Sequence, residues 1–299
     1  MIVPSGSRPG IVPHVRTAPG TGRPADIDAA QARWLAWHEA QTHGLIGREV
    51  RDLGDGVLLH DRSDREPFWN RLAGIAWPSA PDAFDRRLAE AIALFGVLDR
   101  IPHVWPAPGF DEPPDLVARL ESNGFDDMGA GLLMALDVDR LPVAPPSDGQ
   151  AGRIDIRRFH HLSGEAAARA ARDVASVLSD AFAVDPDRRA AIEEETIVLL
   201  GRDEFHVCLV TVDGQPAAAA RRTTFAGASY LSSIGTQPEF RGRGLGRIVT
   251  DAVTRDAVAA GSRWTYLGVF SDNAVARRMY EGLGFRTIGE PAPDLLLRS

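Results

Sequence analysis

The feature that most constrains the fold is an internal repeat. When the sequence is shifted by 160 residues without a gap, VWPAPGFDEPPDLVARLESNGF (104–125) lies on WTYLGVFSDNAVARRMYEGLGF (264–285). Both segments have a strand-like start, a turn, a helix-like run and a closing Gly-Phe, which is Gly124-Phe125 in one and Gly284-Phe285 in the other. Few positions are identical, so a chance match is the alternative. The shared register favours a duplication and predicts two copies of one fold.

Length and composition are compatible with two such copies. The chain has 299 residues, of which 44% are hydrophobic and 25% are charged, and this is enough for two globular domains. The formal net charge of −8 argues against nucleic-acid binding, because such proteins carry a basic face. No apolar run approaches the roughly 20 residues of a membrane span. We therefore expect a cytoplasmic protein with no nucleic-acid or membrane partner, and Cys208, the single cysteine, excludes an internal disulfide.

Two segments rich in proline and glycine divide the chain. Residues 1–25 show no hydrophobic periodicity and are predicted to form a flexible arm. Residues 141–152, LPVAPPSDGQAG, are typical of a linker between domains. These limits predict one domain over residues 26–140 and a second over residues 153–299.

The second half has a clear pattern of elements. A strand-like segment at 153–159 precedes helix-like runs at 164–182 and 187–200. Three strands follow over 205–236, with hairpin-type breaks at Asp213-Gly214 and Ala226-Gly227. A helix ending near Gly261, a strand at 264–270, a helix at 273–283 and a final strand complete the order. The pattern predicts an α+β fold, in which a mixed, mostly antiparallel sheet is flanked by helices.

The stretch EFRGRGLGRIVTDAV (239–253) places three glycines and three arginines at the start of a helix-like run. It does not match the Walker phosphate loop, which needs a lysine, or the dinucleotide-binding pattern, which needs a different glycine spacing. A strand that ends near Thr236, a glycine-bearing turn and a helix start nevertheless form a phosphate site. The free N–H groups of a helix start carry a partial positive charge, so a pyrophosphate suits this turn.

Two motifs of the second half resemble those of the GNAT superfamily of N-acetyltransferases. Arg241-x-x-Gly244-x-Gly246 is similar to the acyl-CoA signature of that family, and Pro238 stands three residues before it, as in the family. Thr236 departs from the family pattern, which has an apolar residue there. The helix motif that follows in the family is matched by Asn273, Ala276, Tyr280 and Gly284-Phe285. The resemblance covers about residues 150–299 and implies that the second half binds acetyl-CoA.

The resemblance also implies roles for single residues. The pyrophosphate would bind the amides of the glycine-rich loop, and the pantetheine would run along the preceding strand, where a backbone N–H would hold the thioester oxyanion. Tyr280 would be catalytic and would protonate the departing thiolate. The alternative for the last helix is structural, with a capping Asn273 and a packed Tyr280. The expected cofactor-binding residues are Ile234, Gly235, Thr236, Arg241, Gly242, Arg243, Gly244, Leu245, Gly246, Arg247 and Asn273.

No general base and no metal site are indicated. The strand ASYLSSIGT (228–236) contains no carboxylate, so Tyr230, Ser232 and Ser233 could only orient a water molecule. Glu239 lies in the loop, where we expect a solvated surface position. His160, His161 and His206 lack the spacing of metal ligands.

In the first half, each functional position is replaced at the 160-residue offset. The loop residues correspond to Pro81, Phe84 and Arg86, and the helix residues correspond to Pro113 and Leu120. We therefore expect one acyl-CoA site in the chain. The first half would be a degenerate copy that helps to shape the acceptor site, as in tandem GNAT proteins.

The leading hypothesis is an acyl-CoA-dependent N-acetyltransferase, in which a primary amine of a small molecule or peptide attacks acetyl-CoA directly. A non-catalytic acyl-CoA sensor or interaction module is the alternative, because the strand beside the cofactor lacks a carboxylate. A nucleic-acid binder that uses Arg241, Arg243 and Arg247 is a third hypothesis, which the net charge disfavours. The sequence does not indicate the oligomeric state.

Overall fold

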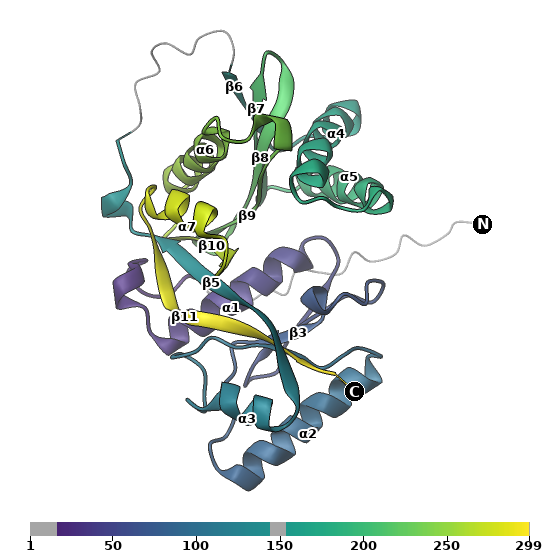
Figure 1. Ribbon diagram of the computed structural model, residues 1–299, viewed down its shortest axis with the longest axis vertical. Coiled ribbons are helices and arrows are strands. Elements are labelled where there is room, and N and C mark those ends of the chain that lie inside the picture. Colours follow the sequence, from purple (N-terminus) through teal and green to yellow (C-terminus); the bar gives the residue numbers. More distant parts are fainter. Residues whose placement is uncertain (1–16, 144–153, 299) are drawn as a thin grey trace, which may run out of the picture.

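The computed structural model describes residues 17–143 and 154–298 (Figure 1). The first half contains η1 (Pro24–Asp26), α1 (Ala29–Gly44), β1 (Glu49–Asp52), β2 (Val57–His60), η2 (Pro67–Trp69), β3 (Arg71–Ala73), α2 (Pro81–Val97), β4 (His103–Trp105), α3 (Leu116–Ser122), β5 (Phe125–Leu136) and η3 (Val138–Arg140). The second half contains β6 (Ile154–Phe159), α4 (Gly164–Ala181), α5 (Pro186–Leu200), β7 (Phe205–Val212), β8 (Gln215–Phe225), β9 (Ala228–Thr236), η4 (Pro238–Phe240), α6 (Leu245–Ala259), β10 (Trp264–Phe270), α7 (Ala274–Glu281) and β11 (Phe285–Leu297).

The described strands form one mixed sheet in the order β1-β2-β3-β4-β11-β5-β10-β9-β8-β7-β6. The run β1-β2-β3-α2-β4-α3-β5 of the first half has the same element order as β7-β8-β9-α6-β10-α7-β11 of the second. In both halves the third strand is parallel to the strand that follows the next helix, as β3 is to β4 and β9 is to β10. The structure thus has the duplicated α+β architecture that the repeat predicts.

Strands β5 and β11 are exchanged between the halves. β5 pairs with β10 of the second half, with Ala135 opposite Tyr266, and β11 pairs with β4 of the first half, with Leu295 opposite Val104. The two long strands lie side by side in the centre of Figure 1 and also pair with each other. Gly129 (φ 140°) and Gly289 (φ 65°) occupy equivalent positions in them at the 160-residue offset. Each half therefore completes the sheet of the other.

Alanines on β8 allow helices to pack on both faces of the sheet. All four residues of Ala217–Ala220 are 0% exposed. Ala218 and Ala220 belong to the core under α6, whereas Ala219 belongs to the core under α4, because successive side chains of a strand point to opposite faces. Helices α4 and α5 consequently cover one face of β7–β9 and α6 covers the other (Figure 1).

Part of the predicted flexible arm is instead packed. The N–H of Ala18 donates a hydrogen bond to the carbonyl of Ala226 at 2.7 Å, and the indole N–H of Trp264 donates to the carbonyl of Pro19 at 2.9 Å. Ala18 is 1% exposed, so burial of this segment against the second half outweighs its proline-rich and glycine-rich composition. Residues 1–16 and most of the predicted linker 141–152 lie outside the described residues.

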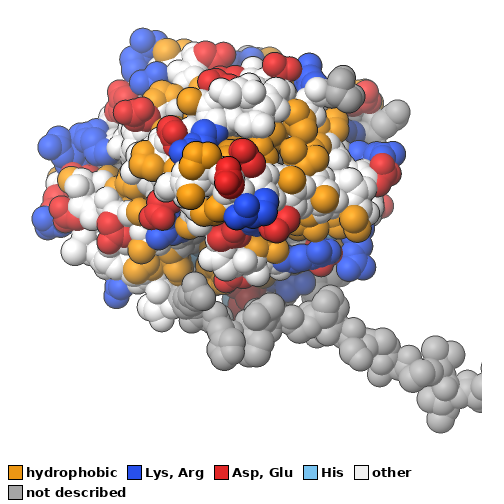
Figure 2. Space-filling model, turned by 90° about the horizontal axis from the view of Figure 1, so that it is seen from below, with side chains coloured by type: hydrophobic (Ala, Val, Ile, Leu, Met, Phe, Trp, Pro, Cys, Tyr) orange, Lys and Arg blue, Asp and Glu red, His pale blue; other side chains and the backbone are white. Residues whose placement is uncertain are grey.

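The surface in Figure 2 shows acidic and basic side chains mixed with apolar ones and no continuous basic area on that face. Within residues 17–143 and 154–298, every helix is too short or too polar to cross a bilayer.

Candidate functional site

Strands β9 and β10 start as neighbours and then separate. Their parallel pairing runs from Ala228 opposite Trp264 to Leu231 opposite Leu267 and ends there. Beyond this point, β9 continues only with β8, and β10 continues only with β5. The facing edges of residues 232–236 and 268–270 thus have no strand partner in the described part of the chain. An extended ligand can pair with such an edge through backbone hydrogen bonds.

A bulge in β9 lies at the start of this opening. Arg221 of β8 is opposite Ser232, but Ala219 is opposite Gly235, so β9 contains one extra residue. Ser233 has a φ of 49°, a left-handed conformation that costs a non-glycine residue on the order of 1 kcal/mol. The bulge takes a residue out of the β8 ladder, which frees backbone groups beside Ile234 for a ligand. The structure therefore has an open strand edge and a bulge at this place, and the binding of a cofactor by Ile234, Gly235 and Thr236 stays a prediction.

The N-terminus of α6 is open at the end of β9. Its N-cap residue, Gly244, has a φ of 77° and provides no side-chain cap, as is also the case for α2, α3 and α4, whereas α1 and α7 each begin with a side-chain cap. Gly242 also has a left-handed φ, of 75°. The first N–H of the helix that is bonded within it belongs to Ile248, at 3.1 Å from the carbonyl of Gly244. The N–H groups of residues 245–247 and the helix dipole therefore form a site for an anion.

Small residues bring the loop close to its neighbours. A Cβ on Gly246 would lie 3.2 Å from Oγ1 of Thr236 and 3.6 Å from Sδ of Met279, so α6 approaches both β9 and α7 here. Leu245 is 1% exposed and fixes the helix in the core. The strand end, the loop and α7 are thus in direct contact.

The three arginines of the loop differ in their partners. Nη2 of Arg241 donates a hydrogen bond to the carbonyl of Ala181 at 2.8 Å, and Nη2 of Arg247 donates to the carbonyl of Gly282 at 3.1 Å. Arg243 is exposed, and its guanidinium lies 5.4 Å from the centre of the Phe240 ring. Among the side chains of the described loop, that of Arg243 has the most freedom to meet an anion, whereas Arg241 and Arg247 hold backbone carbonyls.

Asn273 and Tyr280 lie at the two ends of α7 and have structural roles. Oδ1 of Asn273 accepts a hydrogen bond from the N–H of Ala276 at 3.1 Å, which caps the helix. Tyr280 is 6% exposed and its ring centre lies 6.0 Å from that of Phe285. Burial raises the pKa of Tyr280 to about 12, so the phenol keeps its proton at neutral pH. Such a phenol can act as a proton donor, and the contact of both residues with CoA stays a prediction.

The opposite side of the opening carries a second phenol. Tyr230 packs on Tyr266 with ring centres 5.2 Å apart, and a Cβ on Gly268 would lie 4.0 Å from its hydroxyl oxygen. Burial raises the pKa of Tyr230, and the charge of Glu39 adds to the effect. Tyr230 therefore stays neutral, and a residue of the first half influences it.

The first half contributes an aromatic and charged cluster beside this phenol, which the sequence did not reveal. Glu39 of α1 accepts hydrogen bonds from Arg71 at 2.6 and 2.7 Å and from His43 at 2.8 Å. The guanidinium carbon of Arg71 lies 4.5 Å from the centre of the Phe68 ring and 4.4 Å from that of the Trp105 ring, and these two rings are themselves in contact, with centres 5.7 Å apart. Burial favours the neutral acid, but Arg71 and His43 outweigh it and hold the pKa of Glu39 at about 2. Glu39 is consequently an anion with fixed partners and not a general base.

The histidines are closer together than their sequence positions suggest. The ring of His160 lies 4.9 Å from that of His161 and 5.3 Å from that of His206, because the loop after β6 packs beside β7. No group of three or more His, Cys, Asp or Glu residues that the structure describes is arranged to hold a metal ion. Cys208 is 2% exposed, and burial together with Asp256 raises its pKa to about 12, so its thiol is not poised as a nucleophile.

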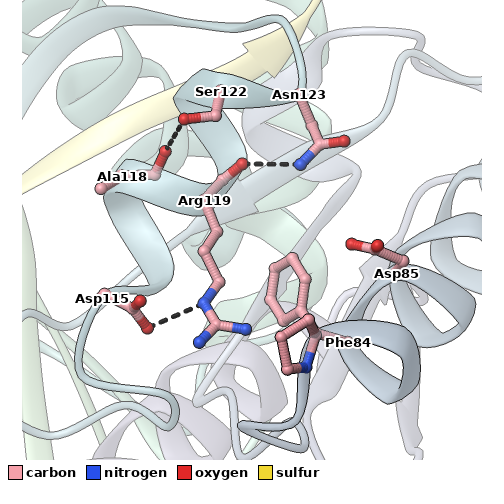
Figure 3. A pocket seen from close by; sticks show the side chains of 8 residues that line it. Phe84, Asp85, Asp115, Ala118, Arg119, Ser122 and Asn123 are labelled. Atoms are coloured by element: carbon pink, nitrogen blue, oxygen red, sulfur yellow. Dashed lines mark hydrogen bonds and ion pairs between the residues drawn. The ribbon is translucent and has the colours of Figure 1, made fainter.

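The equivalent place in the first half is chemically different (Figure 3). Helix α2 begins with Pro81, which has no N–H, and with Asp82, so its first turn repels an anion. Arg119 lies over the Phe84 ring and is paired with Asp115 at 2.8 Å. A cavity of about 360 Å³ remains there, lined by Pro81, Phe84, Asp85, Asp115, Ala118, Arg119, Ser122 and Asn123. These residues disfavour a second pyrophosphate site.

Comparisons with known proteins agree with this arrangement. A family model described as FR47-like protein, which is GNAT-like, matches residues 210–292 and thus includes both motifs. Over 52 residues the chain is 48% identical to a mycothiol acetyltransferase from Nocardiopsis dassonvillei, a match that covers 17% of this chain and only 16% of that relative.

Solved structures match over most of the chain. A GCN5-related N-acetyltransferase from Kribbella flavida has a TM-score of 0.63 and 21% identity, and the match covers 90% of this chain and 96% of that one. A tandem GNAT protein from the clavulanic acid biosynthesis pathway has a TM-score of 0.57 and 14% identity, with the same coverage of 90% and 96%. The GNAT resemblance of the sequence and the tandem arrangement of its fold are therefore confirmed.

Proposed function

We propose that this tandem GNAT protein is an acyl-CoA-dependent N-acetyltransferase with one active site, in the second half. The observation that carries the proposal is the open N-terminus of α6 at the end of a strand whose edge has no partner beyond Leu231. A pyrophosphate and an extended pantetheine chain need these two features side by side. The named relatives, which include a mycothiol acetyltransferase, support the same activity.

In this proposal the backbone does most of the binding. The N–H groups of Gly242 to Arg247 hold the pyrophosphate, with Arg243 as the available cationic side chain. The pantetheine pairs with residues 232–236, and an N–H beside the bulge holds the thioester oxygen as negative charge develops on it. One such preorganised donor is typically worth a factor of about 10² to 10³ in rate.

The chemical step is a direct attack. A neutral primary amine forms the new C–N bond at the acetyl carbonyl, the C–S bond breaks, and Tyr280 gives its proton to the thiolate of CoA. The nitrogen loses one of its own protons as the amide forms, and solvent water carries a proton back to the Tyr280 oxygen, so the products are the amide, the CoA thiol and a neutral tyrosine. The acceptor is a small molecule or a peptide with a primary amine. No side chain is assigned as general base, because Arg71 and His43 hold the pKa of Glu39 at about 2, which makes its carboxylate a weak base.

The test is the release of CoA from acetyl-CoA over a panel of primary amines. We expect turnover by the wild-type chain and a loss of about 10² or more in kcat for Tyr280→Phe, which keeps the packing on Phe285 but has no proton to give. Unchanged kcat in Tyr280→Phe would remove this residue from the chemistry. Tight acetyl-CoA binding without turnover of any amine would instead indicate a non-catalytic acyl-CoA-binding module.

A further inference from the structure

The C-terminal end of α4 packs directly on β9 beside the bulge. Gly235 permits this contact, since a Cβ at this position would lie 2.8 Å from Cβ of Ala181 and 3.4 Å from a ring carbon of Phe182. Ile234, the preceding residue, packs against the core under α6. Gly235 therefore faces the other side of the sheet, where α4 lies. The ring of Phe182 is in contact with this face, yet the residue is 54% exposed.

Side chains from the end of β9 and the loop hold this end of α4 in place. Arg241 bonds the carbonyl of Ala181 at 2.8 Å and that of Thr236 at 3.3 Å, so it connects α4 to β9. Nε2 of Gln237 donates a hydrogen bond to Oδ2 of Asp180 at 2.9 Å. The chain then turns at Ala183, which has a φ of 50°. These hydrogen bonds fix the distance between the end of α4, with Phe182, and Gly235 of β9.

Phe182 lies on the side from which an acceptor would approach. The proposed oxyanion donor is in the bulge beside Ile234, next to Gly235 in the chain. Helices α6 and α7, with Tyr280, occupy one face of this part of the sheet. On the other face α4 ends at Ala181, beside Gly235, so an amine can approach the thioester past the end of this helix, where the aromatic side chains of Phe182 and Tyr230 lie.

We propose that Phe182 is a wall of the acceptor site that favours amines with an aromatic or apolar substituent, and that Arg241 is a positioning residue that holds this wall over the thioester. This inference rests on the proposed function, which gives the position of the thioester. An exposed ring beside the reacting atoms provides apolar contact area for the carbon skeleton of the acceptor. The Phe182 ring provides no such contact area to an amine that lacks an apolar carbon skeleton.

The first experiment measures binding and needs no turnover. Calorimetry would follow 2-phenylethylamine and ethylamine, as probes, binding to the full chain saturated with CoA. We expect the aromatic probe to bind at least about tenfold more tightly than ethylamine, and Phe182→Ala to remove most of that difference without changing the Kd of CoA. Phe182→Leu, which keeps an apolar side chain, should restore part of it. Equal binding of both probes to the wild-type chain, or no effect of Phe182→Ala, would overturn the proposal.

The second experiment tests the role of Arg241 against a matched control. Arg241→Met and Arg243→Met both remove one positive charge from the loop, but only Arg241 bonds α4. We expect both variants to weaken CoA binding, and only Arg241→Met to weaken 2-phenylethylamine binding at saturating CoA. Equal binding of this probe to the two variants would refute the positioning role. CoA turnover with the same amines is measured separately, so a failure of the catalytic proposal would be distinguished from a failure of the acceptor wall.

Discussion

His38 should make the stability of this protein fall as the pH is lowered below about 6.5. The residue is 0% exposed at the contact between α1 and the second half, where its ring stacks on Phe225 with centres 4.0 Å apart. Its Nδ1 lies 2.7 Å from the hydroxyl of Tyr266, and its Nε2 lies 3.2 Å from the carbonyl of Phe225. A neutral ring fits both partners if Nε2 carries the proton and Nδ1 accepts from the tyrosine. Burial lowers the pKa of His38 to about 3.

The magnitude follows from the difference between the folded and the unfolded pKa values. The unfolded chain takes up a proton at His38 below a pKa of 6.5, but the folded chain does so only near a pKa of about 3. The stability that depends on neutral His38 is therefore present above 6.5 and is lost as the pH falls towards 3. Each pKa unit is worth about 1.4 kcal/mol, so about 2 kcal/mol should be lost between pH 7 and pH 5.

Urea unfolding at both pH values, for the wild-type chain and for His38→Phe, would measure this effect. The phenylalanine keeps the stacking on Phe225 but does not titrate. The effect of His38 is the difference between the two chains in the free energy of unfolding that each loses from pH 7 to pH 5. This difference is needed because other groups also make stability depend on pH: burial lowers the pKa of His206 to about 4 and raises that of Asp111 to about 7, with opposite effects on stability. If the wild type and His38→Phe lose the same free energy of unfolding between pH 7 and pH 5, or if the His38 ring titrates near pH 6.5 by NMR, the reasoning is wrong.

Two further predictions concern the loop and the exchanged strands. Gly244→Ala should weaken acetyl-CoA binding about tenfold, because alanine is strained at a φ of 77°, by about 1 to 2 kcal/mol. Gly261→Ala is the matched control, because Gly261 has a φ of 75° and equally open space around it. This variant should lose a similar free energy of unfolding but bind acetyl-CoA with the wild-type Kd. Equal Kd values for the two variants would contradict a pyrophosphate site at the loop. Residues 17–143 expressed alone should lack a cooperative unfolding transition, because β5 would lose β10 and β11. The two halves produced together should recover this transition, and a folded isolated half would be evidence against the exchange.

Much of the second half could be predicted because its signals are local. The Asp213-Gly214 and Ala226-Gly227 breaks are the hairpins between β7, β8 and β9, and the glycine-rich run does precede α6. Hydrophobic periodicity and turn chemistry act over a few residues, so they can be read from one sequence. The Gly-Phe match at 124 and 284 likewise marks the starts of the equivalent strands β5 and β11.

Features that depend on distant pairing could not be predicted. The sequence of β5 does not say whether its neighbour is β4 or β10, because strands pair through backbone N–H and C=O groups that every strand offers. Glu39 and Arg71 influence the pKa of Tyr230 only because the two halves pack together, and nothing in the spacing of these residues in the sequence indicates that. The composition of residues 17–25 suggests flexibility, but the buried side of Ala18 decides their structure.

The exchange of β5 and β11 also explains why a copy without a CoA site would be retained after duplication. β10 forms one side of the opening beyond Leu231 and Leu267, and its other neighbour is β5, which the first half supplies. If the second half carries the proposed active site, selection on its activity would act directly on the sequence of the first half, because β5 is part of the same sheet. Mutations that destabilise the first half would then be selected against, because they would change the separation of β9 and β10 in the second half.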